Sequence, residues 1–352
     1  MSDTLQFGLN TFGDITIGHD GQKLSDAQVI RNVVEEAVHA DQVGLDFFGV
    51  GEHHRDDFAV SAPEVVLAGI ATRTNRIRLG SAVTVLSSDD PVRVYQRFAT
   101  VDALSNGRAE VVLGRGSFTE SFPLFGYPLH QYEDLFSEKL ELFAKLRHEQ
   151  PVTWQGKLRA SLTNQQVYPR TEHANIKTWV GVGGNPESVV RAARLGLPLM
   201  MAIIGGEFHR FRPLVELYHR SLAQFGHDLL PVGVHSPGHI AATDEEALEQ
   251  LWPHWQAIYN RIGSERGWPP VTKRDFLAVA GPTGALYVGS PETVAQKIAN
   301  TVTTLQLTRF DLKYSSATLP HDLMLKSIHL YGSEVAPRVR ELVNERASLP
   351  VG

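Results

Sequence analysis

The feature that most constrains the fold of this chain is a regular alternation of short apolar runs with longer helical patterns. The apolar runs predict eight strands, at residues 5–10, 46–51, 77–86, 109–114, 177–183, 198–203, 232–241 and 309–315. Some runs, such as AEVVLG and TWVGVG, are apolar at almost every position, which is typical of strands covered on both faces. The alternation therefore predicts a parallel sheet with helices packed against it.

The helices between these strands have recognisable start signals. Ser25, Ser61 and Thr243 each lie three residues before Gln or Glu, which is the spacing of a capping box. Three further capping residues lie directly before a proline: Asp90, Asn185 and Ser290. Eight strand-then-helix repeats predict an α/β fold of the (β/α)8 TIM barrel type, with a doubly wound open sheet and a second domain as the alternative.

We expect residues 1–352 to form one barrel domain, because no Ser/Gly-rich linker or run of like charges marks a boundary. Two segments are longer than simple connections. Residues 116–133 are rich in aromatic residues, and residues 263–287 contain prolines and little helical periodicity. Long irregular segments of compact folds are usually functional, so both are predicted to be extended loops that act as lids at the C-terminal mouth of the barrel.

The composition excludes several classes of protein. Lys and Arg number 33 against 39 Asp and Glu, and a net charge of −6 argues against a nucleic-acid partner. The absence of cysteine excludes disulfides, thiolate metal sites and cysteine nucleophiles. No stretch approaches the roughly 18 apolar residues of a membrane span, and the first residues lack the pattern of a secretory signal. We therefore expect a cytoplasmic protein with no membrane partner.

Ionisable residues follow the second predicted strand directly, in the sequence GEHHRDD at 51–57. Chemistry in a barrel lies at the C-terminal ends of the strands, and histidine exchanges protons near neutral pH. Glu52, His53 and His54 are therefore candidates for a functional site, with a solvated rim as the alternative. A metal-dependent hydrolase would use the same three side chains. Adjacent residues of an extended strand point to opposite faces, so we expect no metal site here.

Two further strand ends suit an anion. Arg115 lies between glycines after the fourth strand, and a guanidinium group binds oxyanions through two parallel hydrogen bonds. The sequence GGNPES follows the fifth strand and opens a helix, whose free N–H groups and dipole favour negative charge. Arg115, Gly184, Asn185 and Ser188 form a candidate phosphate cradle. The alternatives are a salt bridge of Arg115 and simple N-capping by Asn185. A proline replaces the third glycine of a dinucleotide fingerprint, which argues against a Rossmann site.

Taken in order, these segments resemble the bacterial luciferase-like superfamily of flavin-dependent oxidoreductases. The blocks that carry the resemblance are GEHH (51–54), LGSAV (79–83), DPVR (90–93), DALSNGR (102–108), GRG (114–116), GGNPES (183–188), GLP (196–198), VGSPETV (288–294) and EVAPRVR (334–340). They cover almost the whole chain. The resemblance implies a (β/α)8 barrel that binds FMN, or in some branches a deazaflavin, at its C-terminal mouth.

The resemblance also implies roles for individual residues. His53 matches the histidine near the reactive edge of the flavin ring. The positions that support the ring are Asn10, Thr11, Ala82 and Val83, the last two joined by a cis peptide bond. The positions that hold the phosphate are Arg115, Gly184, Asn185 and Ser188. The positions assigned to the substrate pocket are Glu52, His54 and Phe118.

The activity that the resemblance implies is that of a monooxygenase. Reduced FMN, delivered by a separate flavin reductase, would react with O2 to give a flavin hydroperoxide that oxygenates a small-molecule substrate, with His53 handling protons. Some relatives take electrons directly from NADPH, and the family commonly forms homodimers. The alternatives are a deazaflavin-dependent hydride-transfer enzyme and a flavin-binding protein without turnover. Gly114 stands where luciferase has a reactive cysteine, so light emission is not implied, and residues 263–287 match no family segment.

Overall fold

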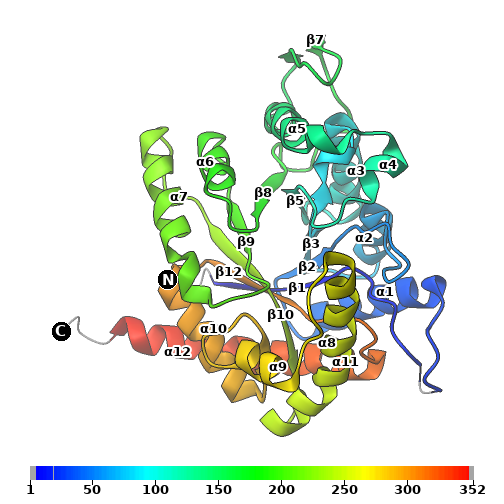
Figure 1. Ribbon diagram of the computed structural model, residues 1–352. Helices are drawn as coiled ribbons and strands as arrows, with labels where there is room; N and C mark the ends of the chain where they lie inside the picture. Colours follow the sequence, from blue (N-terminus) through cyan, green and yellow to red (C-terminus); the bar gives the residue numbers. More distant parts are fainter. Residues whose placement is uncertain (1–4, 19, 349–352) are drawn as a thin grey trace.

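The computed structural model describes residues 5–18 and 20–348. Eight parallel strands close into a ring (Figure 1), and the ring is complete because β12 pairs with both β10 and β1. In order around the barrel, the strands are β1 (Gln6–Thr11), β2 (Phe47–Val50), β3 (Arg78–Ser81), β5 (Ala109–Gly114), β8 (Lys177–Val182), β9 (Leu199–Ala202), β10 (Val232–Ile240) and β12 (Arg309–Lys313). The predicted TIM barrel is confirmed, and the doubly wound alternative is wrong.

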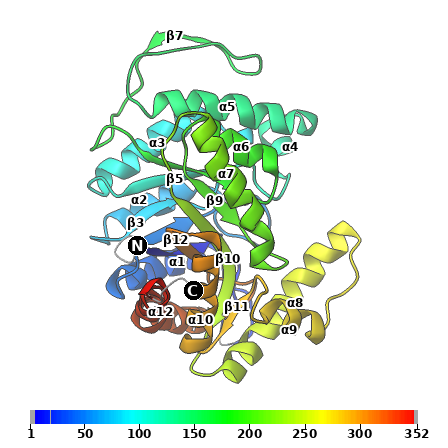
Figure 2. The same ribbon diagram turned by 90° about the vertical axis from the view of Figure 1, so that its left-hand side faces the viewer.

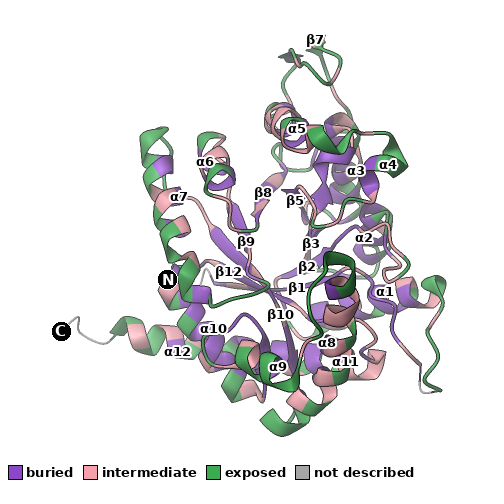
Figure 3. Cartoon of the chain, in the orientation of Figure 1, coloured by how far each residue is buried: buried purple, intermediate pink, exposed green. Residues whose placement is uncertain are grey.

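Helices follow the strands and cover the outside of the ring. They are α1 (Asp26–Gln42), α2 (Pro63–Ala71), α3 (Pro91–Leu104), α5 (Tyr132–Leu146), α6 (Pro186–Arg194), α7 (Arg212–Gln224), α8 (Asp244–Arg266), α10 (Pro291–Leu305), α11 (His321–Leu330) and α12 (Ala336–Ser348). Figure 3 shows buried residues on the strands and on the inner faces of these helices, with exposed residues outside. No helix among the described residues is long and apolar enough to cross a bilayer.

The predicted capping residues lie where the sequence indicates, with one exception. The side chains of Ser25, Asp90, Asn185, Thr243 and Ser290 each accept a backbone N–H from the first turn of their helix. The helix predicted to begin at Ser61 instead begins at Pro63, with Ala62 as its N-cap and no side-chain bond. A proline at the first helical position makes the preceding residue the cap, whatever its side chain.

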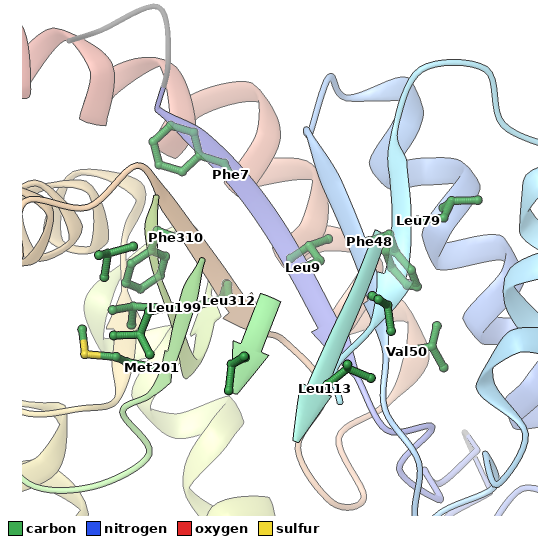
Figure 4. Packing of buried hydrophobic residues seen from close by; sticks show 14 of the residues in the cluster. Phe7, Leu9, Phe48, Val50, Leu79, Leu113, Leu199, Met201, Phe310 and Leu312 are labelled. Atoms are coloured by element: carbon green, nitrogen blue, oxygen red, sulfur yellow. The ribbon is translucent and has the colours of Figure 1, made fainter. Parts of the chain in front are cut away.

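Strand periodicity separates an apolar outer layer from a polar interior. Side chains at alternate positions, such as Phe7, Leu9, Phe48 and Val50, point outward and pack in the layer between strands and helices (Figure 4). The intervening positions point into the barrel. In the interior, the buried Arg309 forms salt bridges with the carboxylates of Glu110 at 2.7 Å and Asp311 at 2.8 Å. This network fills the interior beneath the mouth with paired charges.

Two short strands extend the barrel, and one hairpin lies outside it. β4 (Thr84–Val85) pairs with β5, and β11 (Tyr287–Gly289) pairs with β10. The sequence did not indicate the antiparallel hairpin of β6 (Val152–Trp154) and β7 (Leu162–Gln165). In Figure 2 this hairpin lies at the opposite side of the molecule from α8 and α9 (Lys273–Ala280).

The two predicted loops contain more regular structure than expected. Residues 116–133 include α4 (Ser121–Phe125) and a 3-10 turn, η3 (Leu129–Gln131). Residues 263–287 hold the end of α8, the whole of α9 and the start of β11. A reciprocal capping box of Thr272 and Asp275 starts α9, and Phe276 packs against Trp255 of α8. This short-range capping signal stabilises a helix too short for its periodicity to stand out.

Candidate active site

A cavity of about 600 Å³ opens at the carboxyl ends of the strands. Seven predicted site residues line it: Asn10, Glu52, His53, Ala82, Val83, Arg115 and Phe118. The other five predicted residues, which do not appear among its lining, are Thr11, His54, Gly184, Asn185 and Ser188. The sequence therefore pointed to the end of the barrel at which this cavity opens, and the individual contacts show how each residue is held there.

His53 lies at the centre of an aromatic cluster. Its ring centroid is 4.6 Å from that of Phe12, 4.5 Å from Phe58 and 4.9 Å from Phe118. Its backbone N–H donates to Val60 at 3.0 Å, which fixes the loop after β2. Burial among these rings lowers the pKa of His53 to about 3. At neutral pH the imidazole is therefore uncharged, with one N–H donor and one acceptor nitrogen.

Glu52 and His54 pair with each other beside this cluster. His54 Nε2 lies 3.1 Å from Glu52 Oε1, and Glu52 Oε2 accepts the Val85 N–H at 3.1 Å. The His54 ring also contacts Phe125 edge-on. Glu52 thus joins the loop after β2 to β4, and the two adjacent histidines have different neighbours. Within residues 5–18 and 20–348, no group of three His, Asp or Glu side chains could hold a metal ion.

Small residues make room in the wall of the cavity. The Ala82–Val83 peptide bond is cis, as the resemblance implies. A Cβ atom added at Gly51 would lie 2.7 Å from the carbonyl oxygen of Ala82, and one added at Gly114 would lie 2.6 Å from a methyl group of Val83. Glycine is therefore required at both positions. At residue 114, the contact with Val83 excludes any side chain on this wall of the cavity.

Arg115 belongs to an anion-binding cluster with two residues that the sequence did not single out. The Glu133 carboxylate accepts hydrogen bonds from Arg115 of the loop after β5 and from Arg191 of α6. A buried nitrogen of Arg191, Nη1, and the buried hydroxyl of Ser188 have no hydrogen-bond partner among the described residues. Residues three apart on a helix share a face, so the three-residue spacing from Ser188 could have identified Arg191 from the sequence.

The start of α6 has the geometry that the sequence predicts. Asn185 accepts the Glu187 N–H at 2.8 Å, which is simple N-capping. Gly184 has φ +114°, a conformation that favours glycine, and a Cβ atom there would have only Phe211 within 4 Å. Its neighbour Gly183 lines the cavity. The first turn of α6 therefore lies next to the cavity, with one backbone donor already satisfied by Asn185.

A polar cluster that the sequence did not indicate forms the floor of the cavity. The Asn10 amide nitrogen lies 2.8 Å from His235 Nδ1 and 3.5 Å from Asp311 Oδ2, so the amide donates to both. This assigns the proton of the neutral His235 imidazole to Nε2. Burial, with a contribution from Lys313, lowers the pKa of His235 to about 4. Only the strand register brings these side chains of β1, β10 and β12 together.

Lys313 and Asp14 form an ion pair beside this floor. Lys313 Nζ lies 2.8 and 3.0 Å from the two oxygens of Asp14, and Ser315 donates to the same carboxylate at 2.6 Å. Thr11, predicted to line the floor, lies behind it: its hydroxyl is 2.9 Å from that of Ser315 and accepts the Gly13 N–H. Thr11 therefore supports the residues that line the cavity.

Arg55 joins three segments at the mouth. It pairs with Asp57 of its own loop at 3.1 Å, with Glu120 before α4 at 2.7 Å and with Glu265 near the end of α8 at 2.6 Å. Its guanidinium group also lies 4.5 Å from the ring centre of Phe118. One half-buried cation thus connects the loop after β2 to both of the predicted lid segments.

Comparison with known proteins agrees with this architecture. A family model described as luciferase-like monooxygenase matches residues 6–308. The chain belongs to this family. Among its relatives, the uncharacterized protein y4vJ of Sinorhizobium fredii is 34% identical over 334 residues, which is 91% of this chain and 95% of that protein. The alkanal monooxygenase alpha chain of Photorhabdus luminescens is 23% identical over 70% of each chain.

Solved structures of monooxygenases and of coenzyme F420-dependent enzymes share the fold. Monooxygenase RslO1 from Streptomyces bottropensis matches with a TM-score of 0.81 and 22% identity over 95% of this chain and 99% of that one. The 3,6-diketocamphane monooxygenase component of Pseudomonas putida, solved with FMN, gives 0.74 and 19% over the same shares. The coenzyme F420-dependent tetrahydromethanopterin reductase of Methanopyrus kandleri gives 0.72 and 18%, again over those shares.

Proposed function

We propose that this luciferase-like oxidoreductase uses reduced FMN and O2 to oxygenate a small organic substrate. The observation that carries the proposal is the anion-binding cluster beside the cavity. Glu133 occupies the hydrogen-bonding positions of Arg115 and Arg191, as a phosphate oxygen would, and Arg191 Nη1 and Ser188 Oγ offer further unused polar atoms. Charge-assisted bonds to a guanidinium pair suit the phosphate of FMN.

The remaining groups fit a flavin ring in the cavity. When bound, reduced FMN supplies the two electrons with which O2 places one oxygen atom in the substrate and the other in water. The glycines at 51 and 114 leave the Ala82–Val83 peptide free to support a flat ring. The aromatic side chains around His53 exclude water from the reacting groups. His53, being uncharged, can donate or accept one hydrogen bond at the place that the family resemblance assigns to it.

The source of electrons belongs to the same proposal. Pro186, the first residue of α6, stands where a dinucleotide fingerprint has its third glycine, so we expect no tight NADPH site. A separate flavin reductase would then supply reduced FMN. A second candidate is hydride transfer with a deazaflavin, because the coenzyme F420-dependent reductase of Methanopyrus kandleri shares the fold.

An anaerobic titration with FMN, reduced FMN and coenzyme F420, followed by absorbance, tests the proposal. We expect reduced FMN to bind most tightly and to be reoxidised on the protein when oxygen is admitted. Tighter binding of coenzyme F420 would replace the proposal with hydride transfer. Binding of none of the three would contradict both functions and leave the barrel without a flavin.

A further inference from the structure

One face of α8 forms an aromatic wall of the cavity. Trp255, Ile258, Tyr259 and Ile262 all line it, at the three- and four-residue spacing that places side chains on one side of a helix. The rings of Trp255 and Tyr259 stack, with centroids 4.1 Å apart and planes 24° from parallel. Trp268, which follows α8, extends this wall toward the exposed rim.

A second aromatic wall comes from other segments of the mouth. Phe12 follows β1, Phe58 lies in the loop after β2 and Phe118 in the segment after β5, and all three line the cavity around His53. The outer part of the cavity thus has flat rings on both walls, contributed by four separate regions of the chain. Aromatic rings attract other aromatic rings in offset and edge-on arrangements beyond the effect of buried area alone.

Most of the charged groups that line the cavity are paired with a neighbour, and Glu52 lies 3.1 Å from His54. Asp14 pairs with Lys313 at 2.8 Å, and Asp311 pairs with Arg309 at 2.8 Å. Arg115 pairs with Glu133 in the anion-binding cluster. Arg266, on the exposed rim, makes no salt bridge among the described residues: it donates to the Ser117 carbonyl at 3.4 Å, and its guanidinium group lies 5.3 Å from the Trp268 ring. The charges below the rim are therefore already compensated, and the guanidinium group of Arg266 lies near aromatic rings of both walls.

We propose that the outer part of this cavity binds a planar aromatic molecule as substrate, in contact with the rings of the α8 wall and of the phenylalanine wall. That this molecule is a substrate rests on the proposed function. That the site binds an aromatic ring rests on the two walls alone. An unbranched alkyl chain would fill the same volume without ring-to-ring contacts. The structure thus assigns this cavity a preference for flat rings over chains.

The test compares two neutral alcohols with the same number of carbon atoms, 2-naphthol and decan-1-ol, by calorimetric titration of the protein in the presence of excess FMN. We expect 2-naphthol to bind about tenfold more tightly. Tyr259→Leu should reduce this preference severalfold, whereas Tyr259→Phe, which keeps the ring and loses only the hydroxyl bond to Ile204, should retain it. Phe225→Leu, a ring at the end of α7 outside the cavity, is the matched control.

Three outcomes would overturn the proposal: equal or tighter binding of decan-1-ol, an unchanged preference in Tyr259→Leu, or the same loss in Phe225→Leu. If Tyr259→Leu does not fold, Phe118→Leu on the phenylalanine wall replaces it. Flavin titration of the same proteins keeps the two claims separate. Failure to bind any flavin while 2-naphthol still binds would sink the proposed function only, and the reverse result would sink the aromatic site only.

Discussion

His53 is surrounded by aromatic rings, and this burial determines its protonation. Its pKa in the folded protein is about 3, below the ordinary value of 6.5. Between these values an unfolded chain binds a proton that the folded chain does not. The free energy of unfolding therefore falls as the pH is lowered from about 6.5 toward 3. His53 should act at neutral pH as an uncharged hydrogen-bonding group.

Replacing His53 by Gln should make the protein less sensitive to acid. On lowering the pH from 7 to 5, we expect the variant to lose about 2 kcal/mol less of its unfolding free energy than the parent. Urea denaturation at both pH values measures the difference. The exposed His130, changed to Gln, is the control. Identical pH dependence of parent and His53→Gln would show that burial does not hold His53 uncharged.

The sequence predicted part of the site at the scale of single residues. Arg115 could be predicted because glycines flank it at a strand end, and His53 because a run of ionisable residues follows a buried strand. Glu133 could not, since its role depends on a contact with two arginines far from it in sequence. His235 could not either, because it lies inside an apolar strand and only the register places it next to Asn10.

At the scale of elements, two helices contribute to the mouth: α6 begins next to the cavity, and one face of α8 lines it. The N-terminus of α6 depends on its cap, Asn185, whose side chain accepts the Glu187 N–H. Asn185→Ala should destabilise the protein by about 1 kcal/mol in urea denaturation. Asn185→Asp keeps the cap, so its stability should match the parent.

The same aspartate separates capping from cofactor binding. A negative charge at position 185 should weaken binding of FMN while leaving riboflavin unaffected, if the phosphate lies at the start of α6. Fluorescence titration with both flavins measures this. Unchanged FMN binding in Asn185→Asp would restrict Asn185 to its role as a helix cap.

The end of α8 is held at the mouth by Arg55 and Glu265. Glu265 is 40% exposed, so solvent screens its ion pair with Arg55. Glu265→Gln should raise hydrogen exchange severalfold in residues 255–266, as measured by mass spectrometry. Glu249→Gln, an exposed change on the same helix, is the control. Equal protection in both variants would mean that this ion pair does not hold α8 in place.

Elements were predicted well where local signals were strong. The caps before proline placed three helix starts correctly, because the proline fixes the first helical position. Residues 263–287 were expected to be irregular, although α9 lies within them. The β6–β7 hairpin was missed because its strands are short and β7 is largely exposed, so it lacks the apolar signature of the barrel strands.

At the scale of the whole molecule, the alternation of strands and helices was sufficient to predict the barrel. All eight predicted strands overlap strands of the ring, because each must be apolar on the side that meets the helices. The interior was less predictable. Its charges, such as Arg309 and Glu110, occupy strand positions that only closure of the ring brings into contact.

The central claim is that the mouth of this barrel binds a phosphorylated flavin through Arg115 and Arg191. The most direct test measures the affinities of FMN and riboflavin for the parent, Arg115→Ala and Arg191→Ala. The control is Arg194→Ala, because the exposed Arg194 side chain pairs with Glu141 and does not belong to the anion-binding cluster. We predict that Arg115→Ala and Arg191→Ala each weaken FMN binding by about 1.5–3 kcal/mol and leave riboflavin binding unchanged. Arg194→Ala should bind both flavins as the parent does. Equal losses for FMN and riboflavin, or no loss for either, would contradict the account.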